Sequence, residues 1–165
     1  MTTSSPSAHR GATGRPRKFL VVVDKTPECR AAIRFATRRA QHTGGRVTLL
    51  CVVGPGDFQQ WRGVEEIMYE EAHQEAEGLI YAAAETVNAL SGIMPEFVIM
   101  HGHATECLLA LIREDRDISI LVLAAATAKE GPGPLVSMFA GPGQHPIPVT
   151  IVPGGLSDEE IDAMA

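Results

Sequence analysis

The chain has 165 residues, 45% of them hydrophobic and 21% charged, which is typical of one globular domain with a sizeable core. A formal net charge of −6, with no basic stripe in the predicted elements, argues against a nucleic-acid surface. No apolar run approaches the roughly 20 residues that span a bilayer, and no apolar signal core follows the N-terminal charges. Three widely spaced cysteines, Cys29, Cys51 and Cys107, favour neither a disulfide framework nor a zinc site. We therefore expect a cytoplasmic protein without nucleic-acid or membrane partners.

Residues 1–17 are rich in Ser, Thr, Gly, Pro and Arg and contain almost nothing to bury. Ordering them would cost backbone entropy without a compensating gain. We predict a disordered N-terminal tail here, followed by a folded domain over residues 18–153 and a C-terminal tail over residues 154–165.

The folded part opens with a strand, a turn and a helix. The β-branched run 19–23 ends at Asp24. Thr26 suits a helix cap, while Pro27 and Glu28 suit the first turn and the positive end of the helix dipole.

This helix is expected to stop at Gly44-Gly45, and a second continuous apolar strand covers residues 47–53. Two strands joined by a helix imply a right-handed crossover and therefore a parallel pair.

A long helix follows, in which apolar residues recur at steps of three and four. The stripe predicted to pack on the sheet consists of Val64, Met68, Ala72, Ala76, Leu79, Ala83, Val87 and Leu90. Much of the remaining surface carries glutamates, which we interpret as a solvated face rather than a metal site: Glu65, Glu66, Glu70, Glu71, Glu75 and Glu77.

A third strand is predicted at 95–100, with a turn at residues 101–103 and a helix over 104–113 that directs Cys107, Leu108, Leu111 and Ile112 inward. The turn reads His-Gly-His, and an extended HxH pair places both imidazoles on one side, as a metal site requires. No third ligand has a fixed spacing, so we predict no metal and expect Gly102 to let the chain turn between exposed histidines.

Ile118, Ile120, Leu121, Val122 and Leu123 do not alternate with polar residues, which is typical of a strand buried on both faces of a parallel sheet. Small residues at 124–128 and a Gly/Pro-rich loop at 129–134 follow it. Open α/β sheets bind ligands at the carboxyl ends of their strands, so this strand and loop predict a binding site.

Asp24 would face Ala125 if the first and fourth strands are neighbours across a topological switch point. Gly131 and Gly133 are turn residues of the loop that can also cradle an anion. The prolines beside them remove backbone donors.

The C-terminal part offers one or two helical turns at 135–140 and a last strand at 148–152. As a free edge this strand would expose unpaired backbone and aliphatic side chains, so we expect a C2 homodimer through Pro148, Val149, Thr150, Ile151 and Val152. Residues 157–160 begin an acidic helical turn that we interpret as peripheral.

Catalytic signatures are missing from the sequence. There is no GxSxG elbow around Ser137, no HExxH and no GxxxxGK[ST] phosphate loop. A binding function therefore fits better than nucleophilic catalysis.

Five segments together resemble the universal stress protein family: VVVDKTPECRAAIRFATRRA, GGRVTLLCVV, VIMHGHA, ISILVLAAATAKEGPGPLVS and PIPVTIV. The resemblance covers about residues 18–153. It implies a three-layer, flavodoxin-like α/β fold with a five-stranded parallel sheet in the order 3-2-1-4-5, and dimerisation through the last strand.

Many members of this family bind ATP, and the resemblance implies where a site would lie. The Asp after the first strand corresponds to Asp24, a main-chain contact near the end of the second to Val52 or Val53, and a glycine loop follows the fourth strand. The positions assigned to the site are Asp24, Thr26, Val52, Val53, Gly102, Ala125, Thr127, Ala128, Lys129, Gly131, Gly133, Val136 and Ser137.

The family loop reads Gly, two residues, Gly, nine residues, Gly-Ser, and this sequence departs from it. Ala125 and Ala128 stand at the first two glycines, and Val136-Ser137 matches the Gly-Ser pair only in a loop one residue shorter. An alanine in a glycine conformation costs roughly 1–2 kcal/mol and crowds the phosphates. We therefore expect weak or absent ATP binding.

The alternative is a rearranged loop in which Gly131 and Gly133 cradle the phosphates and Lys129 supplies charge. In this alternative ATP is a cofactor that the protein binds and hydrolyses slowly.

We predict a cytoplasmic, dimeric stress-response or regulatory module that is not an enzyme. It would act on a protein partner that the sequence does not identify.

Overall fold

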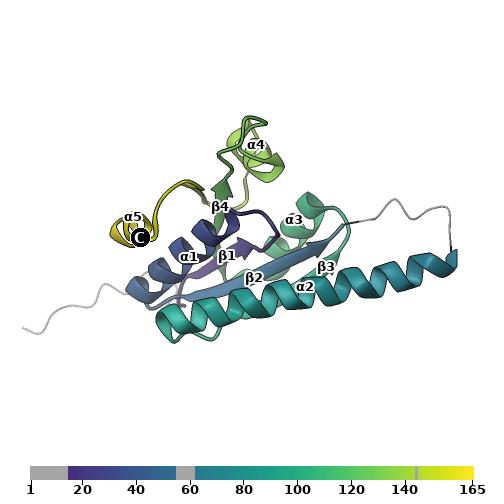
Figure 1. Ribbon diagram of the computed structural model, residues 1–165. Helices are drawn as coiled ribbons and strands as arrows, with labels where there is room; N and C mark the ends of the chain where they lie inside the picture. The colour runs from purple at the N-terminus through teal and green to yellow at the C-terminus, as the bar shows by residue number, and fades with distance from the viewer. Residues whose placement is uncertain (1–14, 55–61, 144) are drawn as a thin grey trace, which may run out of the picture.

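The computed structural model describes residues 15–54, 62–143 and 145–165, without the side chains of residues 62–65. Most of the predicted N-terminal tail, residues 1–14, lies outside the described part. Strands and helices alternate along the chain (Figure 1), as β1 (Lys18–Val22), α1 (Cys29–Thr43), β2 (Arg46–Val53), α2 (Arg62–Ser91), β3 (Glu96–His101), α3 (Ala104–Glu114), β4 (Ile118–Ala125), α4 (Pro134–Ala140), β5 (Val149–Pro153) and α5 (Asp158–Met164).

The five strands form one parallel sheet in the order β3-β2-β1-β4-β5. β1 is the central strand, and Val21 pairs with Leu49 of β2 on one side and with Val122 of β4 on the other. β3 and β5 are the two edges. The predicted α/β class and the strand order implied by the family resemblance are both confirmed.

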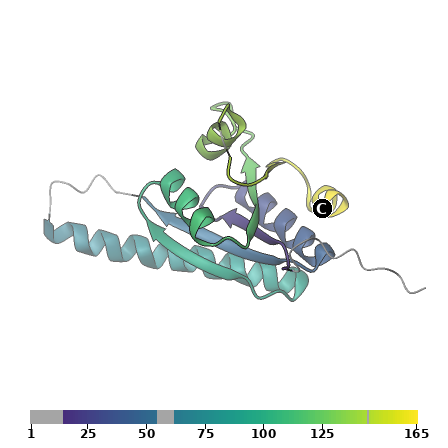
Figure 2. The same ribbon diagram turned by 180° about the vertical axis from the view of Figure 1, so that it is seen from behind.

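Helices cover both faces of the sheet (Figures 1 and 2). Val21 belongs to the core under α1 and α2, whereas Leu20 points to the opposite core under α3 and α4. All four α3 side chains predicted to face inward are buried. Because β1 and β4 are buried on both faces, their sequences are almost entirely apolar.

α2 is 30 residues long, and its N-terminal part extends beyond the sheet (Figure 1). Ala76, Ala83 and Val87 of the predicted stripe are buried. Met68 is 38% exposed, so it is not buried against the sheet as predicted. Ile80, which the prediction omitted, is fully buried. Among the described helices, none combines the length and the apolar character that crossing a membrane requires.

Two ion pairs of a buried lysine tie the amino ends of the strands together. Lys18 of β1 donates hydrogen bonds to Glu96 at the start of β3 and to Asp115 before β4, at 2.7 and 2.6 Å. Burial alone lowers the pKa of Lys18, but these two carboxylates outweigh it and raise the pKa. A buried lysine with two acidic partners stays charged and fixes the register of three chain segments at the edge opposite the candidate site.

The C-terminal segment is not the peripheral tail that the sequence predicted. α5 begins with a capping box, in which Ser157 and Glu160 each accept the other's backbone N–H. Ile161 is fully buried and belongs to the core under α1 and α2. The interpretation of residues 154–165 as a tail beside the domain is therefore corrected.

Complementary charges hold α5 against α1. Arg34 pairs with Asp158 and Asp162, at 3.3 and 2.7 Å, and Arg38 also pairs with Asp162, at 3.1 Å. Arg30 bonds Asp158 and the carbonyl of Leu156. The hydrogen bond from Arg34 holds the pKa of Asp162 well below its usual range. Basic residues at four-residue steps on α1 thus face acidic residues at a four-residue step on α5.

We expect Ile161→Ala to lower the free energy of unfolding by about 2–4 kcal/mol, because it removes a fully buried side chain and leaves a cavity between α5 and α1. Met164→Ala, at a 58% exposed position of the same helix, should change it by less than about 0.5 kcal/mol. Urea unfolding followed by circular dichroism measures both. Equal, small effects would show that α5 contributes nothing to the core.

Candidate functional site

The candidate site lies at the carboxyl ends of β1, β2 and β4, where Asp24 follows the central strand. Asp24 lines two cavities, one on the β4 side and one on the β2 side. We call them the β4-side cavity and the β2-side cavity. The β4-side cavity opens at the topological switch point between β1 and β4, the place in an open α/β sheet where ligands bind.

The turn between β1 and α1 fixes the Asp24 carboxylate. Its Oδ1 accepts hydrogen bonds from the Thr26 backbone N–H, at 2.9 Å, and from the Thr26 hydroxyl. α1 begins at Cys29 with Glu28 as N-cap and without a side-chain capping bond. The prediction that Thr26 caps the helix is therefore wrong, since its hydroxyl is used to orient Asp24.

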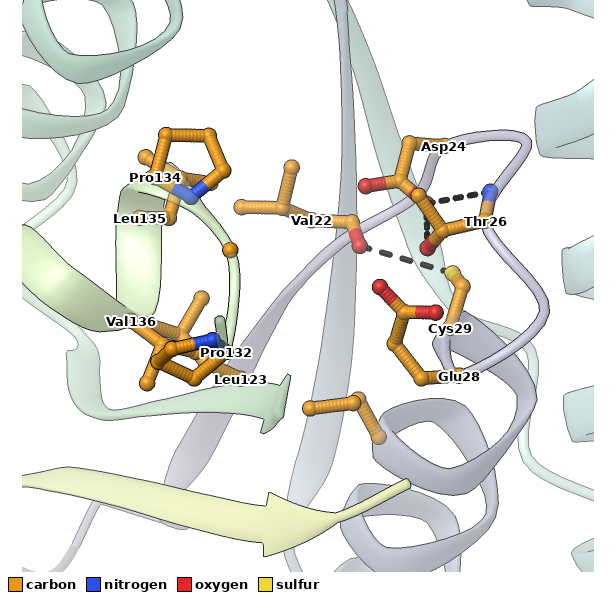
Figure 3. Close-up of a pocket in the computed structure, with 13 residues that line it drawn as sticks. Val22, Asp24, Thr26, Glu28, Cys29, Leu123, Pro132, Pro134, Leu135 and Val136 are labelled. Carbon is orange, nitrogen blue, oxygen red and sulfur yellow. Dashed lines mark hydrogen bonds between the residues drawn. The ribbon is translucent and has the colours of Figure 1, made fainter. Parts of the chain in front are cut away.

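The β4-side cavity has a volume of about 90 Å³ and lies between the start of α1 and residues 132–136 (Figure 3). Two carboxylates, Asp24 and Glu28, lie on one wall and face Pro132, Pro134 and Val136 across the space. Among the described residues, no lysine or arginine lines this cavity. Its electrostatic character is therefore negative.

Cys29 also lines the β4-side cavity, and its thiol points at the carbonyl of Val22, with an Sγ to oxygen distance of 3.6 Å. Burial raises the pKa of this thiol to about 11. The thiol is therefore protonated at neutral pH and unsuited to act as a nucleophile.

The β2-side cavity, of about 250 Å³, lies between the ends of β1 and β2 and one face of α2. Most of its wall is apolar, formed by Val23, Val53, Leu79 and their neighbours. Lys25 and Glu75 form an ion pair at its exposed side. The lysine charge is thus already matched by a carboxylate.

The loop after β4 is folded upon itself. The Ala126 N–H donates to the Pro132 carbonyl at 3.0 Å, and the Gly131 N–H donates to the Ala128 carbonyl at 3.2 Å. Gly131 and Gly133 have φ angles of 105° and 104°, which a residue with a side chain rarely adopts. These backbone donors are consumed within the loop, which leaves fewer of them for an anion.

The cavities collect some of the positions that the sequence assigned to the site. Asp24, Thr26, Gly133 and Val136 line the β4-side cavity, and Asp24, Val52 and Val53 line the β2-side cavity. Seven assigned positions line neither: Gly102, Ala125, Thr127, Ala128, Lys129, Gly131 and Ser137.

Three of these seven positions make backbone hydrogen bonds outside the cavities. The Gly102 N–H donates to the Val53 carbonyl at 2.9 Å, beyond the end of β3. The Ala125 carbonyl accepts from the Gly154 N–H, also at 2.9 Å. Ser137 is an exposed residue of α4, and its N–H donates to Gly133 inside the helix start.

Two lining residues that sequence reasoning missed are Glu28 and Pro132. Glu28 was interpreted only through the helix dipole. The sequence did contain a signal for Glu28. This residue lies four positions after Asp24 at the start of α1, which places it close to the carboxyl end of β1. Nothing in the sequence shows that Pro132 faces it across the cavity.

The His-Gly-His turn does not form a metal centre in the described part of the chain. His101 stacks on Tyr69 and its Nε2 lies 3.0 Å from Nδ1 of His73. Burial, and then the neighbouring His73, lowers the pKa of His101. His103 is instead the N-cap residue of α3. Among the described residues no group of three metal-ligating side chains is found.

Comparison with known proteins identifies the family. The model of the universal stress protein family matches residues 16–133, more than half of the chain. No curated protein matches the chain significantly.

Solved structures share the fold. Universal stress protein UspA from Lactobacillus plantarum has a TM-score of 0.70 and 19% identity, over 84% of this chain and 98% of its own. A universal stress family protein from Burkholderia pseudomallei has a TM-score of 0.62 and 18% identity, over 82% and 95%. A universal stress family protein from Arabidopsis thaliana with AMP bound has a TM-score of 0.60 and 15% identity, over 84% and 92%.

We expect Cys29 to react with iodoacetamide about 100-fold more slowly at pH 8 than an unhindered cysteine, because a thiol with a pKa of about 11 is only about 0.1% thiolate there. Between pH 7 and 9.5 the rate should rise about tenfold per pH unit without a plateau. Peptide mass spectrometry follows the label, and urea-unfolded protein is the control. A plateau near pH 8 in the folded protein would contradict this.

Proposed function

The chain belongs to the universal stress protein family, and we propose that it is a dimeric, cytoplasmic stress-response module that binds ATP weakly or not at all. In this proposal it is not an enzyme and acts through a protein partner. Three buried free cysteines fit a reducing compartment. The proposal concerns adenine nucleotides because the structurally similar protein from Arabidopsis thaliana has AMP bound.

The charge of the β4-side cavity is the observation that carries the proposal on ATP. By the family resemblance this is the phosphate side of the site, and Asp24 is the carboxylate that nucleotide-binding members share. Glu28 adds a second carboxylate to the same wall, and among the described residues no lysine or arginine lines the cavity. Carboxylates within a few ångströms of a polyphosphate repel it, strongly so where water is partly excluded. A phosphate site normally offers backbone N–H groups, lysine or arginine.

The walls of the same cavity support the proposal independently of charge. The Val136 side chain occupies the position that corresponds to a family glycine, and it is buried in the core under α3 and α4. Pro132 and Pro134 lack backbone N–H groups. The loop therefore offers little that could replace the hydration of a triphosphate.

One observation favours the alternative, an ATP-binding member with a rearranged loop. Gly133 lines the β4-side cavity with a φ angle that lets its backbone approach a ligand closely. Lys129, which would supply charge in that arrangement, is exposed and lines neither cavity.

We expect calorimetric titration of the full chain with Mg-ATP to give a dissociation constant in the millimolar range or no measurable heat. Each loss of about 1.4 kcal/mol weakens binding tenfold, so a penalty of several kcal/mol converts micromolar into millimolar affinity. A low micromolar constant would refute the proposal. If it were found, Lys129→Ala and Gly133→Ala would test the rearranged loop, since both should then weaken ATP at least tenfold.

The dimer proposal rests on the position of β5 at an edge of the sheet. Val152 points into the core, whereas Ile151 is 37% exposed on the same strand. α4 has only 7 residues and gives this edge little cover. Pairing of β5 with its copy about a twofold axis would satisfy the outer backbone groups and cover Ile151.

We expect sedimentation velocity at micromolar concentration to show a species of twice the 17.6 kDa chain mass. Ile151→Lys should shift it to the monomer, because each copy would then place a charged side chain in an interface that excludes water. Ile151→Val preserves the strand and serves as the control. A monomer in the unaltered protein would rule the dimer out.

A further inference from the structure

Two histidines from distant parts of the sequence meet at the carboxyl end of β3. His101 is the last residue of β3, and His73 lies on α2. Nδ1 of His73 is 3.0 Å from Nε2 of His101, which is a hydrogen-bond distance. Neither residue lines the β4-side cavity or the β2-side cavity, so the pair is separate from the candidate site.

Each ring is held by a second contact that does not use the facing nitrogens. Nε2 of His73 lies 3.2 Å from Oε1 of Glu77, one helical turn further along α2. Tyr69 stacks on His101 with ring centroids 4.4 Å apart and 20° between the ring planes. The two nitrogens that face each other are therefore positioned before any ligand arrives.

The contact between Glu77 and His73 is the arrangement that metal-binding histidines commonly have. Such a histidine donates its second ring N–H to a carboxylate, which fixes the tautomer and makes the imidazole a stronger base. In His73 the Nε2 proton is donated to Glu77, so the lone pair lies on Nδ1 and points at His101. A surface histidine without such a partner is less well prepared to bind a metal.

The distance between the facing nitrogens indicates the kind of metal. Two nitrogens bonded to one ion at about 2.0–2.1 Å are about 2.9 Å apart when the angle at the metal is about 90°, and about 3.4 Å apart when it is tetrahedral. The observed 3.0 Å is closer to the first value. Angles of about 90° are typical of Cu²⁺ and Ni²⁺ bound by nitrogen and oxygen, whereas Zn²⁺ prefers the tetrahedron.

The surroundings suit a hydrated cation. The side chains of His73 and Glu77 are 38% and 40% exposed, and His101 is also exposed, so the rings have room to turn toward an ion that keeps several water ligands. Residues 66–77 of α2 contain five glutamates and no lysine or arginine. This charge raises the local concentration of cations.

We propose that His73 and His101 bind a divalent transition-metal ion of the Cu²⁺ or Ni²⁺ type, with Glu77 orienting His73 and with water at the remaining positions. The metal replaces the hydrogen bond between the two rings, and the neutral His101 imidazole then carries its proton on Nδ1. This inference does not depend on whether the protein binds nucleotides.

The sequence predicted no metal because only the His-Gly-His turn was considered. His103 of that turn is the N-cap residue of α3, and the partner of His101 comes from α2 instead. Since the described residues contain no group of three metal-ligating side chains, the site has two protein ligands.

The test is calorimetric titration of the untagged full chain with Ni²⁺ and with Cu²⁺ in a buffer that does not coordinate metals. We expect one equivalent to bind with a dissociation constant below about 100 µM for Ni²⁺, and about tenfold or more lower for Cu²⁺, which binds such ligands more tightly. Electron paramagnetic resonance of the Cu²⁺ complex should show coupling to two nitrogens. Dissociation constants above 1 mM for both metals would overturn the proposal.

Histidine variants test which rings bind the metal. His73→Gln and His101→Gln should each weaken Ni²⁺ binding at least tenfold, because each removes one of two protein ligands, and His101→Gln should leave coupling to a single nitrogen. His103→Gln removes the neighbouring exposed histidine and should change the affinity by less than about twofold. If His103→Gln weakens binding as much as His73→Gln does, the turn binds the metal and the pairing of His73 with His101 is wrong.

A matched pair of glutamate variants tests the orienting carboxylate. Glu77→Gln should weaken Ni²⁺ binding about tenfold while the Cu²⁺ complex keeps its coupling to two nitrogens, because the ligands remain but His73 loses its acceptor. Glu85→Gln removes an equal charge from an exposed position further along α2 and should have less than about a twofold effect. Equal effects of the two variants would show that Glu77 acts only through its charge and would overturn its orienting role.

Discussion

The arrangement on which the site depends is the placement of β1 between β2 and β4. Leu20 and Val21 are fully buried on opposite faces of this strand, and its backbone is paired on both sides. Parallel strands require crossovers, so the chain leaves the end of β1 toward α1 and cannot fill the space beside β4. Asp24 is the first exposed residue at that point and so faces both cavities. The fold thus forms the crevice, and the side chains that line it determine which ligand can bind there.

The C-terminal segment packs against the end of β4 and the start of α1, next to this crevice. The N–H of Gly154 donates to the Ala125 carbonyl at the end of β4. A Cβ on Gly154 would lie 2.6 Å from the Cβ of Glu28 and closer still to that carbonyl, so only glycine fits. Because α5 is anchored to α1 by Ile161 and by the arginine rows, the end of β4 and the start of α1 are held together. The position of the Glu28 carboxylate therefore depends on the C-terminal helix.

The sequence predicted what local pattern and burial determine, and it missed what depends on contacts between distant residues. The continuous apolar runs of β1 and β4 and the inward face of α3 follow from periodicity, whereas the strand order came from family resemblance. The wrong reading of residues 154–165 has a physical cause. Acidic residues beside Ile161 look like a solvated turn unless the arginines of α1, more than 120 positions earlier, are known to face them. Thr26 was misassigned for a similar reason, because a threonine before a helix caps it more commonly than it orients a carboxylate.

Under the proposed function, the departures from the family glycines after β4 exchange phosphate binding for packing. In the family pattern the position of Val136 is a glycine whose missing side chain leaves room for phosphate. Here its side chain is buried and packs with Phe139 in the core that also contains Leu121 and Leu123. Burying a valine contributes about 1.5–3 kcal/mol to folding, a gain that is independent of any ligand. With a glycine at the same position this packing would be lost. Phosphate binding could then stabilise the folded state, but only by an amount that depends on the ligand concentration. The buried Val136 side chain on the β4 side thus favours the folded state itself.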